Sequence, residues 1–382
     1  MNDRAAFQVL VLPYRQTAQG TEFALFRRAD ADCWQGVAGG GEAGKSPLQA
    51  ARRETAEEAG LPHPACRTGL RSALPVRGRT PPCTATLLLA SQGSTTSKET
   101  GMPLDSTGKI SFDHIYAEPD PRSFFGTLGQ VDYLIPQLAK PYFSKLIEEY
   151  RAERGVAEPT VLDVGCSYGV NAVLQRCNVT IDQLYDYYTG PDVLALDHEA
   201  LLAADRGRVR SHAGTEDIRF IGLDNSGPAL AYAQSAGFID ATIHADLEQD
   251  DPTPEQQDLL DGVDLVISTG CVGYVTDKTI ARVAHGSRPW MAHFVLRMFS
   301  YDPVAARLAE LGYQSAGVDG VFRQRRFASA EEQTQILDKL SSAGVDPEGL
   351  ETDGWLYAQL YISRPAGAAT ELATVMNAVS PS

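Results

Sequence analysis

The sequence predicts an α/β protein, in which a mostly parallel sheet carries helices on both faces and a smaller α+β domain comes first. Two observations predict this fold class. Beyond residue 113, apolar runs of strand length alternate with helix-compatible segments, which favours a parallel sheet between two helical layers. Before residue 93, short apolar runs flank one well-delimited helix. The chain therefore divides into two regions of unequal size.

Length and composition limit the class of protein. The chain has 382 residues, 43% of them hydrophobic, enough to bury cores in about two or three domains. Its six cysteines show no paired spacing, so we expect free thiols in a reducing compartment and no structural zinc. No apolar run approaches the ~20 residues that cross a bilayer, and the first residues lack a signal-peptide pattern. These features predict a cytoplasmic protein with no membrane partner.

The net charge of −16 is unevenly distributed. Residues 111–382 hold 20 Lys and Arg against 39 Asp and Glu, whereas residues 1–110 are close to neutral. A field of this sign repels phosphate backbones, which makes nucleic acid a poor partner for the second region. We expect a small-molecule substrate. The oligomeric state stays open, with a homodimer among the alternatives.

A change in composition marks the expected boundary. Residues 91–109, "SQGSTTSKETGMPLDSTGK", are rich in Ser, Thr and Gly without a periodic apolar pattern, as is typical of a linker or long loop. The final residues predict a frayed or weakly helical end. The expected divisions are a first domain over 1–92, a linker over 93–112, a second domain over 113–365 and a tail over 366–382.

The helix of the first region carries a cluster of carboxylates. Ser46 is an expected N-cap and Gly60 follows the expected last turn. Within this helix Glu54, Glu57 and Glu58 are spaced i, i+3 and i+4, so they share one face. Crowded carboxylates repel one another unless a cation is present, and such oxygen ligands suit Mg²⁺ or Mn²⁺. The alternative is a solvated acidic face without a metal.

The whole stretch over 39–61, "GGGEAGKSPLQAARRETAEEAGL", resembles the Nudix box. The resemblance implies a Nudix-like domain over 1–92, with the three glutamates as metal ligands and hydrolysis of nucleoside diphosphate derivatives as the activity. Lys45 stands where the family has a glutamate, and few residues follow the box before the linker. An active hydrolase and a non-catalytic module that binds a nucleotide or a partner therefore both stay open.

The second region opens with a strand, a glycine turn and a helix. In "TVLDVGCSYGVN" (160–171), Val161 to Asp163 end a buried strand, and Gly165 and Gly169 bracket a tight turn before a helix. Glycine lets a ligand approach the backbone, and the helix that follows offers unpaired N–H groups. Taken alone, the turn fits either a ligand-binding loop or an ordinary strand-to-helix connection.

Three later strands end in residues that suit a nucleoside. "IRFIGLD" ends in Asp224, whose carboxylate can accept hydrogen bonds from two ribose hydroxyls. "ATIHADL" ends in Asp246 and Leu247, which can pair with an adenine amino group and pack on its ring. "VDLVISTG" runs into Thr269. Because parallel strands present their carboxyl ends at one edge, the sequence predicts a ligand site there.

This succession resembles the class I S-adenosylmethionine-dependent methyltransferases over residues 113–365. The resemblance implies a Rossmann-like methyltransferase fold, S-adenosylmethionine as the cofactor and methyl transfer to a small molecule by in-line displacement. A dinucleotide-binding Rossmann domain is the rival, disfavoured by the glycine spacing. The cofactor-binding residues that the resemblance implies are Asp163, Gly165, Cys166, Ser167 and Gly169 for the methionine part, Asp224 and Asn225 for the ribose, Asp246 and Leu247 for the adenine, and Thr269.

An insertion at about 176–216 separates the first two strands of this region. It contains helical apolar spacing and three close tyrosines in "YDYY", and we expect either a lid or dimer element over the substrate or an extra pair of packed helices. The aromatic "RSFFG" near residue 124 could join it in a pocket or in the core.

No general base stands out in the sequence. The candidates are His114 and Tyr116 ahead of the first core strand, Tyr274 after the fourth, and His293 in "WMAHFVLRMF". For each of them the alternative is a satisfied buried side chain with a packing role. The methyl acceptor, whether oxygen, nitrogen or carbon, stays open.

Overall fold

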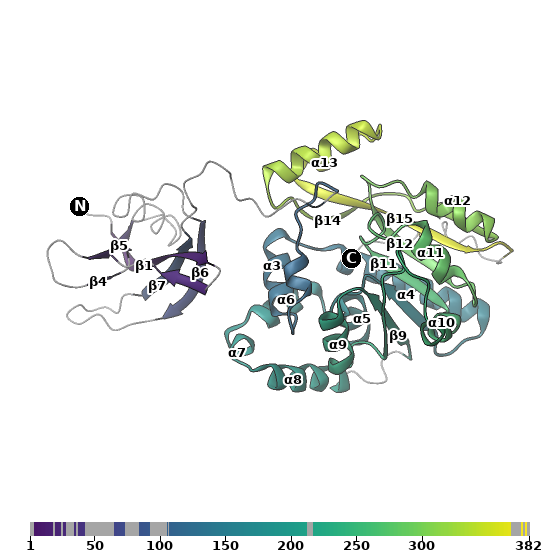
Figure 1. Cartoon of the computed structure of the whole chain (residues 1–382), viewed down its shortest axis with the longest axis horizontal. Coiled ribbons are helices and arrows are strands. Elements are labelled where there is room, and N and C mark those ends of the chain that lie inside the picture. The colour runs from purple at the N-terminus through teal and green to yellow at the C-terminus, as the bar shows by residue number, and fades with distance from the viewer. Residues whose placement is uncertain are drawn as a thin grey trace. The chain divides into compact units, whose positions relative to one another are not determined.

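A computed structural model divides the chain into two compact units, Met1–Gly101 and Met102–Ser382, each described here by itself (Figure 1). The predicted linker spans the division between them. The structure describes residues 4–17, 20–23, 26–27, 34–35, 37–42, 65–72, 84–91, 105, 107–211, 217–367, 376 and 379. The helix expected over 46–60, with Glu54, Glu57 and Glu58, lies outside the described residues.

The N-terminal unit is described through its strands. They are β1 (Arg4–Thr17), β2 (Gly20–Phe23), β3 (Phe26–Arg27), β4 (Trp34–Gln35), β5 (Val37–Glu42), β6 (Ala65–Ser72) and β7 (Thr84–Ser91). The main sheet has the order β2-β1-β7-β6, and β5 also pairs with β1. β1 and β7 run parallel, while β2, β5 and β6 join antiparallel. The strands expected near residues 7–14 and 83–91 are β1 and β7.

The C-terminal unit is built on a mixed sheet of eight strands in the order β10-β9-β8-β11-β12-β15-β13, with β14 also paired to β15. Its strands are β8 (Thr160–Val164), β9 (Arg219–Asp224), β10 (Ala241–His244), β11 (Leu265–Thr269), β12 (Trp290–Leu296), β13 (Tyr313–Gly317), β14 (Phe322–Arg326) and β15 (Trp355–Pro365). The first five strands of that order are parallel, and β15 is antiparallel to its three neighbours. The predicted mostly parallel sheet is confirmed.

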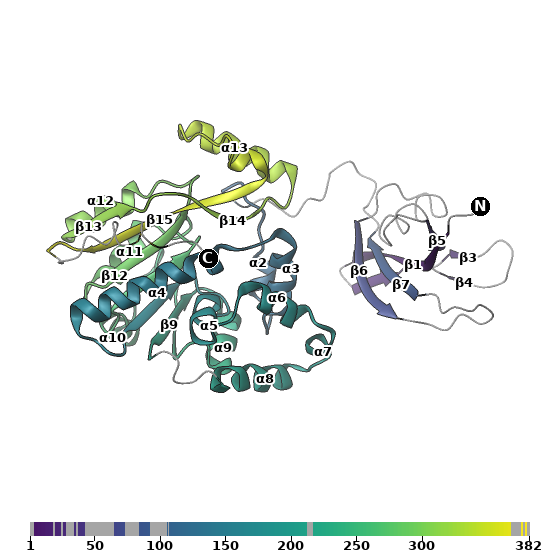
Figure 2. The ribbon, with the colours of Figure 1, turned by 180° about the vertical axis from the view of Figure 1, so that it is seen from behind.

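Helices cover both faces of this sheet. They are α2 (Asp113–Tyr116), α3 (Arg122–Leu128), α4 (Ile135–Arg154), α5 (Val170–Arg176), α6 (Ile181–Thr189), α7 (Pro191–Leu194), α8 (His198–Ser211), α9 (Gly227–Ala236), α10 (Pro254–Asp261), α11 (Asp277–Ala284), α12 (Asp302–Glu310) and α13 (Ala330–Ser342). The turns Gly129–Val131 and Glu351–Asp353 are 3-10 helices. Figure 2 shows α4 lying across one face of the sheet.

Alternation along the strands explains the two helical layers. In β8, Val161 packs with α4 and α9 on one face, whereas Leu162 packs with α10, α11 and α12 on the other. In β11, Ile267 and Val266 divide between the two faces in the same way. Strands that bury both faces must be apolar at nearly every position, as these central strands are. The burial of both faces therefore explains why these parallel strands lie in the centre of the unit, between two layers of helices.

The insertion forms packed helices. α6 contacts α3, and α8 contacts α9. The buried carboxylate of Asp205 on α8 accepts hydrogen bonds from the hydroxyls of Tyr188 on α6 and Tyr232 on α9, at 2.7 and 2.6 Å. Phe125 stacks on Tyr188 with ring centroids 4.5 Å apart, so these aromatic side chains belong to the core. No described residue of 176–216 lines the cavity considered below.

The sequence predicts a frayed or weakly helical end, and two described residues of this end, Met376 and Val379, pack against the core. β15 extends to Pro365, and Met376 is fully buried in the cluster that holds α4 against the sheet. Two residues of that cluster, Tyr142 and Phe294, lie edge to face at 5.9 Å. The hydroxyl of Tyr142 also donates to the carbonyl of Val379 at 3.3 Å. Local composition missed this because the partners of Met376 lie far away in the sequence.

Truncation of this methionine should destabilise the C-terminal unit. We expect Met376→Ala to lower the free energy of unfolding by about 2–4 kcal/mol, because it leaves a cavity in a close-packed core. Leu194→Ala is the control, since Leu194 is 55% exposed, and it should change stability by less than about 0.5 kcal/mol. Urea unfolding followed by circular dichroism measures both. Equal stability of the two variants would show that the terminal residues contribute no packing.

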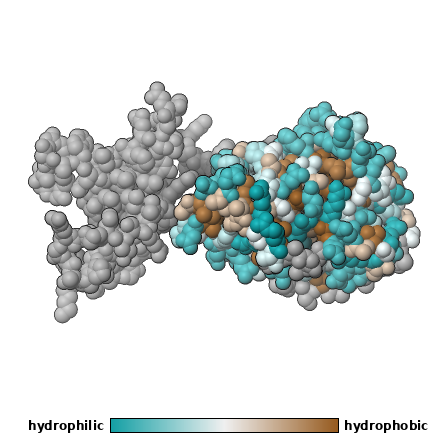
Figure 3. Space-filling model, turned by 90° about the horizontal axis from the view of Figure 1, so that it is seen from below, coloured by the Kyte–Doolittle hydropathy of each residue, from teal (hydrophilic) through white to brown (hydrophobic). Residues whose placement is uncertain are grey.

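The surface of the described part mixes hydrophilic and hydrophobic areas, as Figure 3 shows for one face. Its exposed large hydrophobic side chains are Leu194, Tyr274 and Val321. Among the described residues, every helix is too short or too polar to span a membrane.

Candidate functional site

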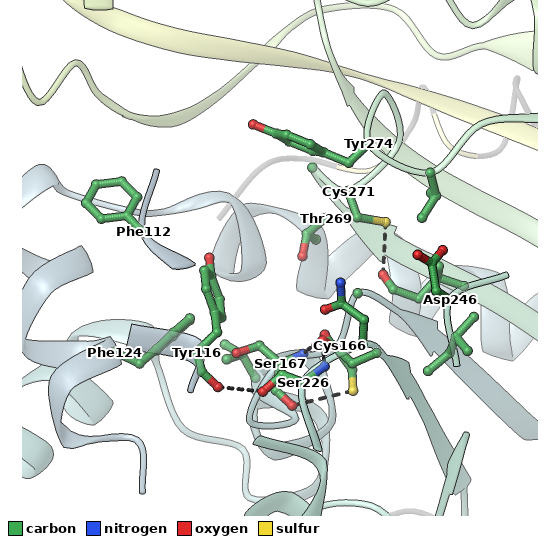
Figure 4. Close-up of a pocket in the computed structure, with 18 of the residues that line it drawn as sticks. Phe112, Tyr116, Phe124, Cys166, Ser167, Ser226, Asp246, Thr269, Cys271 and Tyr274 are labelled. Carbon is green, nitrogen blue, oxygen red and sulfur yellow. Dashed lines mark hydrogen bonds between the residues drawn. The ribbon is translucent and has the colours of Figure 1, made fainter. Parts of the chain in front are cut away.

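A cavity of about 830 Å³ opens at the carboxyl ends of β8, β9, β10 and β11. A volume of this size suits a small organic ligand or cofactor. Figure 4 shows Phe112, Tyr116 and Phe124 gathered on one side of it and Asp246 on the other, with Thr269 between them. Its walls come from the turn after each of the four strands and from residues ahead of β8. The expectation that these strand ends meet at one site agrees with this geometry.

The turn between β8 and α5 brings backbone to the cavity. Gly165, Ser167 and Gly169 all have positive φ angles, of 70°, 50° and 74°. A Cβ on Gly165 would lie 2.7 Å from Cβ of Cys271, so the site excludes any side chain there. The N–H of Gly165 donates to the carbonyl of Leu223 at 2.8 Å, which joins the turn to β9. Glycine is thus required for the turn to approach its neighbours.

Two glycine-to-alanine substitutions distinguish the effect of a strained backbone angle from the effect of a steric clash. We expect Gly165→Ala to weaken the binding of S-adenosylmethionine and S-adenosylhomocysteine at least about tenfold, because the new methyl group displaces Cys271 into the cavity. Gly155→Ala is the matched control: Gly155 has nearly the same φ of 69°, but a Cβ there meets nothing within 4 Å. Calorimetry with both ligands measures the difference. Equal affinities in the two variants would contradict a tight turn.

Asp224 fastens two loops at the end of β9. Its Oδ2 accepts from the backbone N–H of Ser167 at 2.8 Å, and its Oδ1 accepts from the N–H of Ser226 at 2.9 Å. Burial raises the pKa of this carboxyl, and the backbone N–H donors oppose that rise. A carboxylate has about four lone-pair sites, so Asp224 can still accept from a ligand's hydroxyl groups.

A polar chain lies beneath the turn. The side-chain amide of Asn171 donates to both oxygens of Asp163, at 3.0 and 3.2 Å, and to Oγ1 of Thr269 at 3.2 Å. Asp163 is fully buried and does not line the cavity; burial raises its pKa to about 7. Asn171 does line the cavity, and the sequence reasoning did not single it out. Asp163 therefore orients Asn171 from below.

At the β8–α5 side of the cavity wall, two buried polar atoms lack hydrogen-bond partners among the residues that the structure describes: Oγ of Ser167 and Oδ1 of Asn171. Unpartnered buried polar atoms are costly unless a ligand or water satisfies them. Both lie at the glycine turn, where the methionine part of S-adenosylmethionine is expected. The residues present therefore fit a polar ligand at this end.

The predicted cofactor residues fall into two groups. Most of them line the one cavity: Gly165, Cys166, Ser167, Asp224, Asn225, Asp246, Leu247 and Thr269. Two do not: Asp163 supports Asn171, and Gly169 is the N-cap of α5. The loop after β10 is held by Glu248, whose carboxylate accepts from Thr276 and Thr279. Asp246 and Leu247 therefore lie on a restrained loop.

Of the four candidate bases, two line the cavity and two do not. Tyr116 and Tyr274 line the cavity. His114 is exposed and does not, because the short α2 presents it to solvent. His293 is fully buried in β12, where Nδ1 lies 2.8 Å from Oγ of Ser268, and burial lowers its pKa to about 4. The suggestions of His114 and His293 as bases are not supported, because neither faces the cavity.

The cysteine beside the turn is a thiol. Sγ of Cys271 donates to the carbonyl of Val164 at 3.0 Å, and burial raises its pKa to about 12. A thiol with so high a pKa is a poor nucleophile. These contacts fit a packing role for Cys271.

Several cavity residues could not be found by following strand ends. Phe112 and Tyr133 precede β8, whereas Gln324 and Arg325 belong to β14. Lys109 falls inside the predicted linker, yet it is only 8% exposed and lines the cavity. The only local signal for Lys109 was its place in a Gly-containing polar segment, which is equally typical of a loop.

Metal ligation by Glu54, Glu57 and Glu58 falls outside the described residues. Within the part that the structure describes, no group of three His, Cys, Asp or Glu side chains could hold a metal ion.

Residues 6–111 match the family model of the NUDIX domain. This confirms the resemblance of the first region, and the match continues beyond the expected end at residue 92. A solved structure similar to this part is a putative NUDIX hydrolase from Listeria monocytogenes, 30% identical, with a TM-score of 0.21. The alignment covers 22% of this chain and 62% of that one, so the chain spans less than two thirds of that protein.

Solved structures similar to the C-terminal part include methyltransferases. One is a putative sarcosine dimethylglycine methyltransferase from Galdieria sulphuraria, 13% identical, covering 58% of this chain and 85% of that one with a TM-score of 0.31. Another is a TehB-like SAM-dependent methyltransferase from Corynebacterium glutamicum, 12% identical, covering 56% and 84% with a TM-score of 0.27. No curated protein matches the chain.

Proposed function

We propose that the C-terminal unit transfers a methyl group from S-adenosylmethionine to a small-molecule acceptor. The observation that carries the proposal is the meeting of four strand ends at one cavity. Its wall contains a glycine turn, the carboxylates at the ends of β9 and β10, and unpartnered polar atoms beside the turn. Parallel α/β sheets bind their ligands at this edge. The arrangement offers separate polar groups to each part of an adenosyl amino acid.

The chain's own residues would divide the cofactor between them. The carboxylate of Asp224 would accept from the ribose hydroxyls, while Asp246 and Leu247 would hold the adenine. Ser167 and Asn171 would contact the amino acid end, where their unpartnered atoms lie. S-adenosylmethionine, when bound, supplies an electrophilic methyl group on a sulfonium. What the protein adds is mainly alignment, which can contribute several kcal/mol, about 7–11 in well-oriented systems.

The far side of the cavity would hold the acceptor. Phe112 and Phe124 are buried there with Tyr116 beside them, and the ring centroids of Tyr116 and Phe124 are 5.7 Å apart. An aromatic wall suits a small organic molecule. The acidic charge of residues 111–382 further favours such an acceptor over nucleic acid.

Calorimetry with the purified chain tests the proposal. We expect saturable binding of one equivalent of S-adenosylmethionine and of S-adenosylhomocysteine, and no binding of NAD⁺ at the same concentration. NAD⁺ binding without S-adenosylmethionine binding would favour the dinucleotide-binding rival. Incubation of a native cell extract with methyl-labelled cofactor would then identify the labelled acceptor.

A second function is proposed for the N-terminal unit because of the NUDIX family match over residues 6–111. It is Mg²⁺- or Mn²⁺-dependent hydrolysis of a nucleoside diphosphate derivative, with Glu54, Glu57 and Glu58 as the metal ligands. We expect metal-dependent phosphate release from a panel of such compounds, and loss of it in Glu57→Gln. If wild type and variant are equally inert, the unit is a non-catalytic module.

A further inference from the structure

The cavity contains a buried amine that the proposed cofactor contacts do not use. Lys109 is 8% exposed and lines the cavity. Its Nζ lies over the Tyr274 ring, 5.2 Å from the centroid. Among the residues that the structure describes, Nζ has neither a hydrogen-bond acceptor nor an ion-pair partner beyond this ring. A buried amine in this position can be satisfied by a ligand.

The neighbouring carboxylates are already occupied. Glu332 on α13 binds both Nη atoms of Arg325 and accepts from the N–H of Ile110 at 2.8 Å. Oδ1 of Asp105 accepts from the N–H groups of Thr107 and Lys109. Oδ2 of Asp105 accepts from the Tyr274 hydroxyl at 2.7 Å. Both carboxylates thus accept hydrogen bonds from groups other than the ammonium.

Charged groups of both signs act on Lys109. Asp105 of its own segment and Glu332 of α13 favour its ammonium form, whereas Arg325 of β14 opposes it. Lys339, also on α13, packs near Gly108. Burial is the largest influence and, together with Arg325, it lowers the pKa of Lys109 to about 7. The hydroxyl of Tyr274 stays protonated, since burial raises its pKa.

A polar atom without a partner also belongs to the cavity wall on β14. Gln324 is 3% exposed, neighbours Arg325 on β14 and lines the cavity. Its Oε1 has no hydrogen-bond donor within the described part of the chain. An amide oxygen accepts only, so it requires an O–H or N–H on whatever binds here. The aromatic side chains of Phe112 and Tyr116 complete this wall.

We propose that Lys109 and Gln324 form the methyl-acceptor subsite, and that the acceptor is a neutral molecule whose oxygen or nitrogen nucleophile carries a proton that Lys109 removes. This inference rests on the proposed methyl transfer. Gln324 accepts a hydrogen bond from the acceptor and orients it, while Lys109 takes the proton. An anionic acceptor held by a charged lysine is the opposing case, and it needs Lys109 to stay an ammonium.

The step balances without a further reagent. The lone pair of the acceptor atom forms a bond to the methyl carbon, and the carbon–sulfur bond breaks with its pair on sulfur. The proton of the acceptor passes to Nζ of Lys109, which becomes an ammonium, and solvent later removes that proton. The sulfonium becomes a neutral thioether and no electrons are lost or gained. A base that is neutral near pH 7 suits this task.

The charge of Lys109 can be measured with the cofactor pair alone. S-adenosylmethionine carries a sulfonium cation that S-adenosylhomocysteine lacks, while both share the same amino and carboxyl groups. A charged Lys109 therefore weakens the first ligand relative to the second. The affinity ratio is the association constant of S-adenosylmethionine divided by that of S-adenosylhomocysteine. It should rise about fivefold between pH 6 and pH 8.5, because Lys109 loses its charge in this window.

Two substitutions show which affinity ratio belongs to the charged form of residue 109 and which to the neutral form. Lys109→Arg keeps a permanent charge, so the ratio should stay low at both pH values. Lys109→Gln removes the charge, so the ratio should stay high at both. Lys145→Gln on α4 is the matched control, since Lys145 pairs with Glu148 and Glu149 on the surface, and it should titrate like the wild type. Affinity for S-adenosylhomocysteine should stay within about twofold in all variants.

The outcomes distinguish a failure of the methyl-transfer proposal from a failure of the proposed role of Lys109. If neither ligand binds the wild type, the methyl-transfer proposal fails. If both bind but the wild-type ratio is independent of pH, the base role of Lys109 is wrong. It is equally wrong if Lys109→Gln titrates like the wild type, because a group other than Lys109 then titrates; burial raises the pKa of Asp163 to about 7, which makes it a candidate. Should one variant fail to fold, the wild-type profile and the other variant still decide.

Discussion

Asp224→Ala is expected to weaken the binding of S-adenosylmethionine and S-adenosylhomocysteine by about two orders of magnitude, roughly 2.7 kcal/mol. The substitution removes the carboxylate that would hold the ribose. It also leaves the N–H groups of Ser167 and Ser226 without their acceptor, and each lost buried partner costs about 1–3 kcal/mol. The glycine turn then keeps only its backbone hydrogen bonds to Leu223 as ties to β9. Calorimetry at constant pH measures the affinity.

Two variants control this result. Asp250→Ala removes an exposed carboxylate a few residues beyond Asp246 and should leave the affinity unchanged. Asp224→Asn keeps one acceptor oxygen and should fall between the wild type and alanine. Affinity that remains within about threefold in Asp224→Ala would place the ribose elsewhere and remove the main support for an adenosyl ligand at this edge.

Glu332→Gln is expected to cost about 3–5 kcal/mol of unfolding free energy. Arg325 is 3% exposed and Glu332 is fully buried, so the variant leaves a buried guanidinium without its counter-charge. The same carboxylate also accepts from the N–H groups of Ile110 and Ala328, and the amide can satisfy only part of this set. Glu331→Gln, the exposed neighbour on α13, should be within about 0.5 kcal/mol of wild type.

The pH dependence of stability gives an independent check on the pair. Burial opposes ionisation of Glu332, but Arg325 and the backbone donors outweigh it and lower the pKa. A carboxyl with a lowered folded-state pKa stabilises the fold above its unfolded pKa, and this stability is lost as the pH falls through the folded value. Urea unfolding from pH 7 to pH 3 should therefore show a steeper loss in wild type than in Glu332→Gln. Parallel curves would mean that the pair does not titrate.

The sequence predicts the parallel half of the sheet well. β8, β9, β10 and β11 are short and largely apolar runs, β8 and β11 are followed directly by Gly, and each signal is local. The antiparallel half was not anticipated. β13, "YQSAG", and β14, "FRQRR", are polar in composition, and only their pairing with β15 makes them strands. Strand propensity depends strongly on such neighbours.

The candidate site, too, could be predicted from the sequence only in part. The ligand residues at strand ends could be predicted, because topology alone brings them together. Lys109 could not, because its burial is created by Glu332 and Arg325, more than 200 residues later in the chain. His293 takes the alternative of a buried side chain for a related reason, since the strands on either side of β12 bury it within the sheet. Tertiary contacts of this kind leave no local pattern.

Because β15 is the last of its strands to be synthesised, the sheet of the C-terminal unit cannot be completed until β15 has been translated. β12 pairs with β11 on one side, but its other edge stays open until residues 355–365 emerge from the ribosome, and within the described chain β13 and β14 pair only with β15. An open apolar edge strand readily joins a strand from another molecule. Nascent or truncated chains that stop before residue 355 should therefore be prone to aggregate, and chaperones that cover strand edges would act in that interval.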